Sequence, residues 1–486
     1  MTAIRPAPGS PAAPADGGNL ARVLVVVVVG SVMSVLDVTI VNVALHPLAL
    51  AFDAEVATVQ WVATGYTLAL SAVIPLAAWA MGRAGAKRVY LAAIALFTLG
   101  SGLAALAWNI PALVFFRVLQ GLGGGLLMPV GMAMVIGAAD RRRTGGAMAV
   151  LGIPVLVGPV SGPVLGGWLI DAASWRWIFL VNLPIGAVAL FLAARLLRPD
   201  APTVKRRLDL PGLLTLSPGL ALLIYGLTTG GNDGDVTEPG ALLPTVAGLL
   251  LVTGFVLRSL TAREPLLRLR LLADRRLAAG LATMLLFPCG YFGSMMLSPM
   301  YFQTVRGLGA TEAGLLGAPL AVAVGLSMQV ATRRVDRVSP RLLVSCGAAL
   351  AALGLSLFAA QLTAHTPYWR LCAALLVTGV GVGMVMMPAN TTATRGLAPA
   401  DVPYGSTLLA IVSQAGASVG TALLSVVLAS QANGASAGAF RHAYAWAVVL
   451  LALAAVPALL LPGRARPAMP AAEPRVVPAP GRAPVG

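Results

Sequence analysis

Fourteen long apolar stretches constrain the fold of this chain more than any other feature. Each is close to the roughly 20 residues that a helix needs to cross a bilayer. They cover residues 21–45, 59–80, 89–107, 111–137, 146–170, 176–197, 209–229, 240–262, 277–303, 313–332, 341–361, 367–392, 404–429 and 440–461. Closed β-barrels also span membranes, but barrel strands are about half as long and alternate apolar with polar residues. The stretches therefore predict an all-α integral membrane protein with fourteen transmembrane helices.

The low content of charged residues leads to the same fold class. Charged side chains make up 10% of the 486 residues, against about 25% in a soluble domain. Mean hydropathy is +0.87. A chain with so few charges cannot cover a water-facing surface of this size, so much of its surface must face lipid.

The distribution of basic residues indicates the orientation in the membrane. With a cytoplasmic N-terminus and alternating loops, 28 of the 33 Lys and Arg residues fall on the cytoplasmic side, and one, Arg117, falls inside the membrane. An excess of basic residues in cytoplasmic loops is the rule for helical membrane proteins. Both termini are therefore expected in the cytoplasm. The same rule explains the net charge of +16 without nucleic-acid binding.

A weak internal repeat divides the chain into two similar halves. A basic loop that leads into an Ala/Leu-rich helix begins at Gly82 and again at Asp336, 254 residues later. A run of alternate glycines before a proline also occurs twice, at 121–129 and 379–388. Repeats of membrane helices are typical of transporters whose site lies between the halves, although chance similarity between helices of low complexity is the alternative.

Two helices remain if each half contains six, so the predicted architecture is six, two and six helices. The expected parts are a disordered cytoplasmic tail (1–19), an N-terminal six-helix bundle (20–200), two inserted helices with cytoplasmic linkers (201–275), a C-terminal six-helix bundle (276–462) and a second disordered cytoplasmic tail (463–486). The two tails are rich in proline and alanine, a composition that favours disorder.

Two ionisable residues lie deep in apolar stretches and are the first candidates for chemistry. Asp37 is the one acidic residue far from the end of its stretch, and Arg117 is its basic counterpart. Charges inside a membrane are costly and mark functional sites by default. Removal from water favours the neutral carboxyl group, which can then bind and release protons. The alternatives are a structural bond of Asp37 to a neighbouring helix and bonds of Arg117 to backbone carbonyls.

The depths of these two residues are compatible with contact. At 1.5 Å per residue, Asp37 lies about 13 Å below the outer end of its helix and Arg117 about 9 Å below that of its own. We therefore hypothesise that Arg117 tunes the proton affinity of Asp37. The repeat partner of Arg117 in the second half is Leu375, so a special role is expected for the first half.

The fifth stretch combines glycines four residues apart with two Gly-Pro pairs. The glycines form a smooth stripe that lets another helix approach closely, and prolines bend a helix. Ordinary tight packing is the alternative interpretation. The residues of this motif are Gly158, Pro159, Gly162, Pro163, Gly166 and Gly167.

Two further sets of residues are weaker candidates. A basic loop that joins two helices on the cytoplasmic side, or that only supplies inside charge, comprises with its repeat counterpart Arg83, Gly85, Lys87, Arg88, Asp336 and Arg337. Residues that line a substrate cavity, or that only pack or anchor the chain in the membrane interface, are Asn42, Trp61, Tyr66, Gln120, Tyr301 and Gln303. The histidines and cysteines lack metal-ligand spacing, so no metal site is predicted.

Four segments resemble, in order, the signatures of the fourteen-helix drug:proton antiporter family of the major facilitator superfamily. They are LDVTIVNVAL at 36–45, RVLQGLGGG at 117–125, GPVSGPVLGG at 158–167 and WRWIFLVNLPIG at 175–186. The resemblance spans roughly residues 20–460. The chain departs from the family pattern at Gly82, where an aspartate is usual, and at 44–47, which reads ALHP instead of ALP.

The resemblance implies a proton-driven antiporter that exports small organic molecules, either antibiotics and other drugs or a natural product of the producer, and so confers resistance. It implies that Asp37 is the protonation site, that Arg117 is coupled to it, and that the bend of the fifth helix favours export. We expect a monomer in a bacterial inner membrane, with protons and a small organic substrate as partners and no cofactor or nucleic acid. A metabolite or nutrient symporter of the same fold remains the alternative. A membrane enzyme is a remote one, because no cluster of catalytic residues occurs.

The substrate class is narrowed by the acidic residues. Transporters of dicationic drugs in this family often need additional buried acids, and the later stretches contain none; Glu312 is placed at a helix mouth. The expected substrates are therefore neutral, monocationic or amphiphilic anionic molecules.

Overall fold

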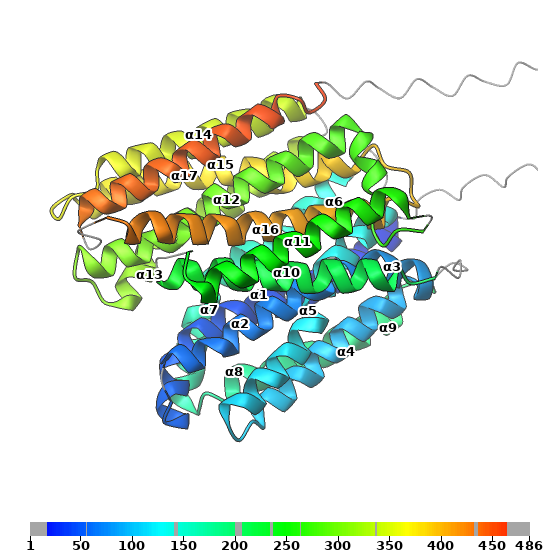
Figure 1. Cartoon of the computed structure of the whole chain (residues 1–486), viewed down its shortest axis with the longest axis horizontal. Coiled ribbons are helices and arrows are strands. Elements are labelled where there is room, and N and C mark those ends of the chain that lie inside the picture. Colours follow the sequence, from blue (N-terminus) through cyan, green and yellow to red (C-terminus); the bar gives the residue numbers. More distant parts are fainter. Residues whose placement is uncertain are drawn as a thin grey trace, which may run out of the picture.

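The computed structural model describes residues 17–54, 56–139, 144–199, 207–233, 237–262, 264–335, 338–431 and 436–463. These residues are almost entirely helical and contain no β-strand. The long helices run roughly parallel to one another in one elongated bundle (Figure 1). The helices are α1 (Gly17–Phe52), α2 (Val56–Val73), α3 (Leu76–Ala84), α4 (Ala86–Ala105), α5 (Ile110–Ala138), α6 (Thr144–Leu151), α7 (Ile153–Ala172), α8 (Trp177–Leu180), α9 (Asn182–Leu196), α10 (Leu210–Asp233), α11 (Pro239–Thr261), η1 (Leu269–Ala273), α12 (Arg275–Thr304), α13 (Ala310–Arg334), α14 (Pro340–Ala360), α15 (Tyr368–Thr394), α16 (Val402–Ala429) and α17 (Ala437–Ala458).

Among the described residues, twelve segments are long and apolar enough to cross a membrane, and each lies on one of the predicted stretches. The broken pair α2 and α3, bent by 56°, adds a thirteenth on the stretch 59–80. Pro75 stands at this break, and proline is a common cause of helix kinks. The stretch 146–170 holds α6 and α7, which are interrupted at Gly152 and are not among these candidate spans. The chain is a multi-pass membrane protein, while the count of fourteen and the six-two-six arrangement stay predictions.

Close helix packing recurs in the two halves at equivalent positions. A Cβ atom on Gly123 of α5 would collide with the backbone of Phe97 in α4. A Cβ atom on Gly381 of α15 would collide in the same way with the backbone of Ala351 in α14. Phe97 and Ala351 are separated by the offset of 254 residues that the sequence repeat gives. The glycines therefore allow the same close contact between backbones in each half.

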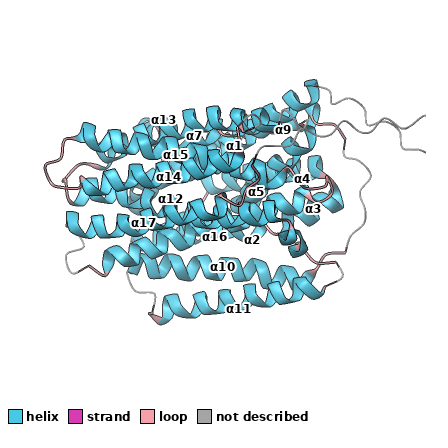
Figure 2. Ribbon diagram, turned by 90° about the horizontal axis from the view of Figure 1, so that it is seen from above, coloured by secondary structure: helices cyan, strands magenta, loops and turns pink. Residues whose placement is uncertain are grey.

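Helices α10 and α11 pack against each other along one side of the bundle (Figure 2). Helix α10 also contacts α2 of the first half and α16 of the second. Asp209, just before α10, is buried and accepts hydrogen bonds from Arg258 (Nε 3.1 Å, Nη2 2.9 Å) and from the backbone amides of Gly212 (3.1 Å) and Leu266 (3.3 Å). This carboxylate ties the start of α10 to the end of α11 and to the segment that follows.

Candidate functional site

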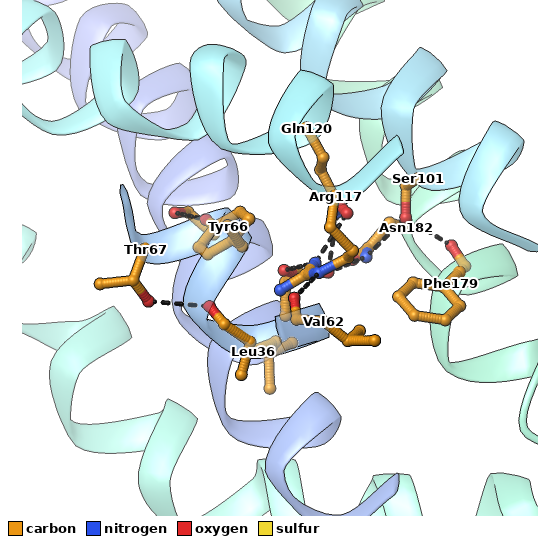
Figure 3. Close-up of polar contacts among 12 residues, drawn as sticks. Leu36, Val62, Tyr66, Thr67, Ser101, Arg117, Gln120, Phe179 and Asn182 are labelled. Atoms are coloured by element: carbon orange, nitrogen blue, oxygen red, sulfur yellow. Dashed lines mark hydrogen bonds and ion pairs between the residues drawn. The ribbon is translucent and has the colours of Figure 1, made fainter. Parts of the chain in front are cut away.

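Asp37 is fully buried in the middle of α1, and three side chains donate hydrogen bonds to its carboxylate. Arg117 Nη1 lies 2.6 Å from Oδ2, Gln120 Nε2 lies 2.8 Å from Oδ1, and Asn182 Nδ2 lies 3.0 Å from Oδ1 (Figure 3). A buried ion pair is stable only when its geometry is good and its remaining polar atoms are bonded. The carboxylate of Asp37 meets this condition in its charged form.

Arg117, on α5, is held by groups from three directions. Its Nε donates to the Val62 carbonyl at 3.1 Å, and its Nη1 also donates to Gln120 Oε1 at 2.7 Å. The guanidinium carbon lies 4.2 Å from the centre of the Tyr66 ring and 5.8 Å from that of Phe179. Arginine keeps its charge inside proteins, and aromatic faces stabilise a cation that has been removed from water. Groups of α2, α5 and α8 thus hold the guanidinium of Arg117 in place.

Asn182 links the carboxylate to two further helices. Its Nδ2 donates to Ser101 Oγ of α4 at 3.1 Å as well as to Asp37, and Ser101 in turn donates to the Phe179 carbonyl of α8 at 2.9 Å. Asn182 is the first residue of α9 and follows the short helix α8. All members of this group belong to elements that precede α10. The position of Arg117 in the second half is occupied by the buried Leu375, so the charged network has no symmetric counterpart there.

The glycine stripe of α7 packs directly on the part of α1 that carries Asp37. A Cβ atom would collide with Val35 if placed on Gly158, with Thr39 if placed on Gly162, and would lie in tight contact with Ile40 if placed on Gly166. Gly167 has no neighbour within 4 Å of such an atom. The Thr39 hydroxyl also donates to the Gly158 carbonyl at 3.2 Å. Helix α7 continues through Pro159 and Pro163, whose side chains lie outside the described part of the structure.

The segment that contacts α1 also contacts the second half of the chain. Gln329 Nε2 of α13 donates to the Ala149 carbonyl of α6 at 2.6 Å. At the interruption between α6 and α7, a Cβ atom on Gly152 would collide with the end of the Met328 side chain. Helices α6 and α7 therefore join the neighbourhood of Asp37 to α13.

The structure brings together four of the residues singled out from the sequence, namely Asp37, Arg117, Gln120 and Tyr66. It does not gather the other cavity candidates there. Trp61 is exposed and stacks on Tyr225 of α10, with ring centres 5.5 Å apart.

Two of the cavity candidates lie on α12. Tyr301 is buried among aromatic rings and donates to the Thr363 carbonyl at 2.7 Å, and Gln303 is exposed at the end of the helix. Aromatic packing of α12 with α14 and α17 explains the position of Tyr301. The side chain of Asn42 lies outside the described residues.

The basic loop after α3 contacts the end of α9 through Lys87. Lys87 Nζ donates to the carbonyls of Ala194 (2.8 Å) and Leu197 (2.7 Å) at the end of α9. Gly85 has a φ of 89°, which favours glycine. Arg83 and Arg88 are exposed. Asp336 and Arg337, the repeat counterparts, lie outside the described residues.

Sequence reasoning missed Asn182 and Ser101, which complete the network around Asp37. The available signal was a polar residue between Val181 and Leu183, within the apolar run of the fourth signature. Neutral polar residues are frequent in membrane helices, so this signal was weak. No group of three or more His, Cys, Asp or Glu residues that could hold a metal ion occurs in the described part of the chain.

Comparisons with known proteins agree with this architecture. The 42% identity to the Multidrug resistance protein B homolog of Mycobacterium tuberculosis extends over 417 residues, which are 85% of this chain and 77% of that protein. A Putative multidrug resistance protein MdtD of Serratia proteamaculans is 32% identical over 444 residues, 89% of this chain and 91% of that one.

Among solved structures, the proton:xylose symporter XylE superposes with a TM-score of 0.63 at 15% identity, covering 89% of this chain and 94% of that one. The human organic anion transporter MFSD10 gives 0.63 at 16% identity, with coverage of 90% and 99%. At such low identity these two structures show the shared fold alone. The model of the Major Facilitator Superfamily matches residues 27–421, and the chain therefore belongs to the major facilitator superfamily of membrane transporters.

Proposed function

We propose that the protein is a proton-driven antiporter that exports small organic molecules from the cytoplasm across a bacterial inner membrane. The observation that carries this proposal is the buried carboxylate of Asp37, bonded to Arg117 and packed beside the glycine stripe of α7. An ionisable group in a membrane helix is a site of ion or proton binding by default. The names of the related multidrug resistance proteins support drugs or antibiotics as the exported class.

The proposed cycle alternates between two protonation states of Asp37. The carboxylate takes up a proton from the outer side and releases it to the cytoplasm, and substrate binds when Asp37 is ionised. Protonation removes the negative charge that faces Arg117, so the two states differ in the forces that act between α1 and α5. Because α7 packs on both α1 and α13, a movement of α1 is transmitted through α7 to α13 in the second half of the chain. A ligand can bias these states only through its different affinity for each.

The proposed topology is fourteen spans in a six-two-six arrangement, with both termini in the cytoplasm and the domain limits given by the sequence. The thirteen candidate spans, together with α6 and α7 as one interrupted span, support this count. The contacts of α10 with α2 and α16 support an inserted pair of helices between two bundles. We propose that a single chain performs transport.

The proposed function is tested by transport in inside-out membrane vesicles with an imposed pH gradient. A panel of antibiotics and dyes is added, and collapse of the gradient is followed. Antiport predicts that a substrate releases protons from the vesicles and accumulates inside them, and that accumulation stops when an ionophore removes the gradient. Accumulation that is unaffected by the ionophore, or substrate movement in the same direction as protons, would contradict antiport.

A second prediction concerns the charge of the substrate. Asp37 is the one acidic residue more than a turn from a helix end in the described helices, and its charge is already neutralised by Arg117. Glu312 instead caps the start of α13, where it accepts from the Gly309 amide at 3.3 Å. A dication would have no free carboxylate to replace its lost hydration. Expression is therefore expected to protect cells from neutral or monocationic toxins but not from dicationic biocides, as measured by growth inhibition. Strong protection against a dicationic biocide would contradict this assignment.

A further inference from the structure

The side-chain carbonyl of Asn182 is a buried acceptor without a partner. Both N–H groups of its amide are in use, one on Asp37 Oδ1 at 3.0 Å and one on Ser101 Oγ at 3.1 Å. Its Oδ1 is fully shielded from water and makes no hydrogen bond in the described structure. Buried polar atoms are nearly always bonded, so an exception calls for a functional explanation. The amide that carries this unpaired oxygen is hydrogen-bonded to the carboxylate of Asp37, which takes up a proton in the proposed transport cycle.

Protonation of Asp37 changes the hydrogen-bond partners that this carboxyl group requires. The ionised carboxylate only accepts hydrogen bonds, whereas the neutral acid carries an O–H that must donate one. The three side chains that bond to Asp37 all present N–H donors to it. Gln120 has a carbonyl oxygen, but it already accepts from Arg117 at 2.7 Å. The oxygen of Asn182 is the side-chain acceptor beside the carboxyl group that is still unused.

We propose that Asn182 is a positioning residue that stabilises both protonation states of Asp37 by turning its amide about the last side-chain bond. In the ionised state Nδ2 donates to Asp37, as the structure has it. When Oδ1 of Asp37 carries the proton, the turned amide places its carbonyl oxygen where Nδ2 now lies. That oxygen accepts the O–H of Asp37 and the hydroxyl of Ser101, which then leaves the Phe179 carbonyl of α8. The two N–H groups of the turned amide give up both present acceptors and take the place of the present Oδ1. The inference rests on the proposed function, because it assumes that Asp37 titrates.

The other groups around Asp37 favour Asn182 as the acceptor for its proton. The titratable group that bonds to Asp37 is Arg117 from α5, and Tyr66 from α2 lies against the Arg117 guanidinium. The charged residues of α7 and α9, Asp171 and Arg195, lie at the ends of those helices. Helices α6 and α8 contain no charged residue. Of the three side chains that donate to this carboxyl group, Asn182 is the one whose amide can present an acceptor to it without breaking a bond to Arg117.

Infrared difference spectroscopy between acidic and alkaline pH tests the proposal on the whole protein in lipid. Asparagine is labelled with ¹³C so that its side-chain carbonyl band is identifiable. We expect one asparagine carbonyl band to move to lower frequency in the same pH range in which a protonated carboxyl band appears, because the carbonyl gains two hydrogen bonds. Both bands are expected to vanish in the double variant Asp37→Leu/Arg117→Met. Asn182→Leu removes the asparagine band only.

Gln120→Leu is the matched control, because it removes an equivalent donor from the same carboxylate oxygen but no unused acceptor. The asparagine band is expected to persist in this variant. Asn182→Leu is also expected to slow proton-coupled exchange roughly tenfold or more, the effect of a lost hydrogen bond to a charged group. An Asp37 carboxyl band without a coupled asparagine band in the unmodified sequence would overturn the inference and leave the proposed function intact. Absence of any carboxyl band that depends on Asp37 would overturn both.

Discussion

Replacement of either Asp37 or Arg117 alone is expected to destabilise the protein by about 3–5 kcal/mol and to abolish proton-coupled transport. Each residue is almost completely buried, and the two form an ion pair of 2.6 Å. Loss of one partner leaves the other as an uncompensated buried charge. In Asp37→Asn, the guanidinium of Arg117 keeps the Val62 carbonyl, Gln120 and the Tyr66 ring, but no negative charge remains to balance it.

The double variant Asp37→Leu/Arg117→Met separates folding from transport. Methionine is close to arginine in volume and leucine is larger than aspartate, so the two apolar residues fill the space without any buried charge. Replacement of a buried ion pair by well-packed apolar residues is often neutral or stabilising. We therefore expect the thermal stability of the double variant in detergent to return to that of the unmodified protein, or above it. Transport in inside-out vesicles stays absent, because no group is left to carry the proton.

Arg268→Met is the matched control for this experiment. Arg268 pairs with Asp401 at 2.5 Å, but both side chains are partly exposed. Pairs of this kind contribute about 0–1 kcal/mol, so we expect a small change in stability and retained transport. Robust proton-coupled transport by Asp37→Asn would remove Asp37 from the mechanism. A double variant as unstable as the single ones would show that the pair does more for folding than balance its own charges.

The charged part of the site was predictable from the sequence because charges are so costly in a membrane. Asp37 and Arg117 stood out from apolar stretches, and the orientation of the helices placed them at similar depths. Asn182 and Ser101 did not stand out, since neutral polar side chains in helices are often satisfied locally. Thr98, for example, donates to the carbonyl four residues earlier, at 2.8 Å. Only the tertiary structure distinguishes such a residue from one that bonds across helices.

The long helices were predictable and their interruptions were not. The length of an apolar stretch indicates a whole transmembrane span, so the stretches matched the candidate spans. The length does not indicate where a helix is interrupted, as at Gly152 or between α8 and α9. The packing partners of the cavity candidates Trp61 and Tyr301 were not predictable for a related reason. An aromatic residue in a membrane helix has the same sequence signature whether it faces lipid, a cavity or another ring. The partner is fixed by packing between helices that are distant in sequence.

Gly162→Ala is expected to reduce transport about tenfold or more and to lower stability by about 1–3 kcal/mol, the usual effect of overpacking. Its new Cβ would collide with the hydroxyl oxygen of Thr39, two residues from Asp37 on α1. That hydroxyl lies within hydrogen-bond distance of the carbonyls of Val35, Leu36 and Gly158, which share its single O–H. Because it cannot turn away without losing these bonds, α7 must move away from α1. The contact between the protonation site and the helix that reaches α13 is then weakened.

Gly167→Ala provides the matched control, since a Cβ atom there meets nothing within 4 Å. Alanine is more favourable than glycine in a helix by about 0.5–1 kcal/mol, so this variant is expected to be equally or more stable and to transport normally. Thr39→Ala combined with Gly162→Ala removes the colliding hydroxyl and should recover part of the lost transport, as coupled neighbours do in double-variant cycles. Equal transport by Gly162→Ala and Gly167→Ala would show that close contact of α7 with α1 is dispensable. Selective loss in Gly162→Ala, with recovery in the double variant, would locate the coupling at the contact between Gly162 and Thr39, since neither substitution touches Asp37 or its hydrogen-bond partners.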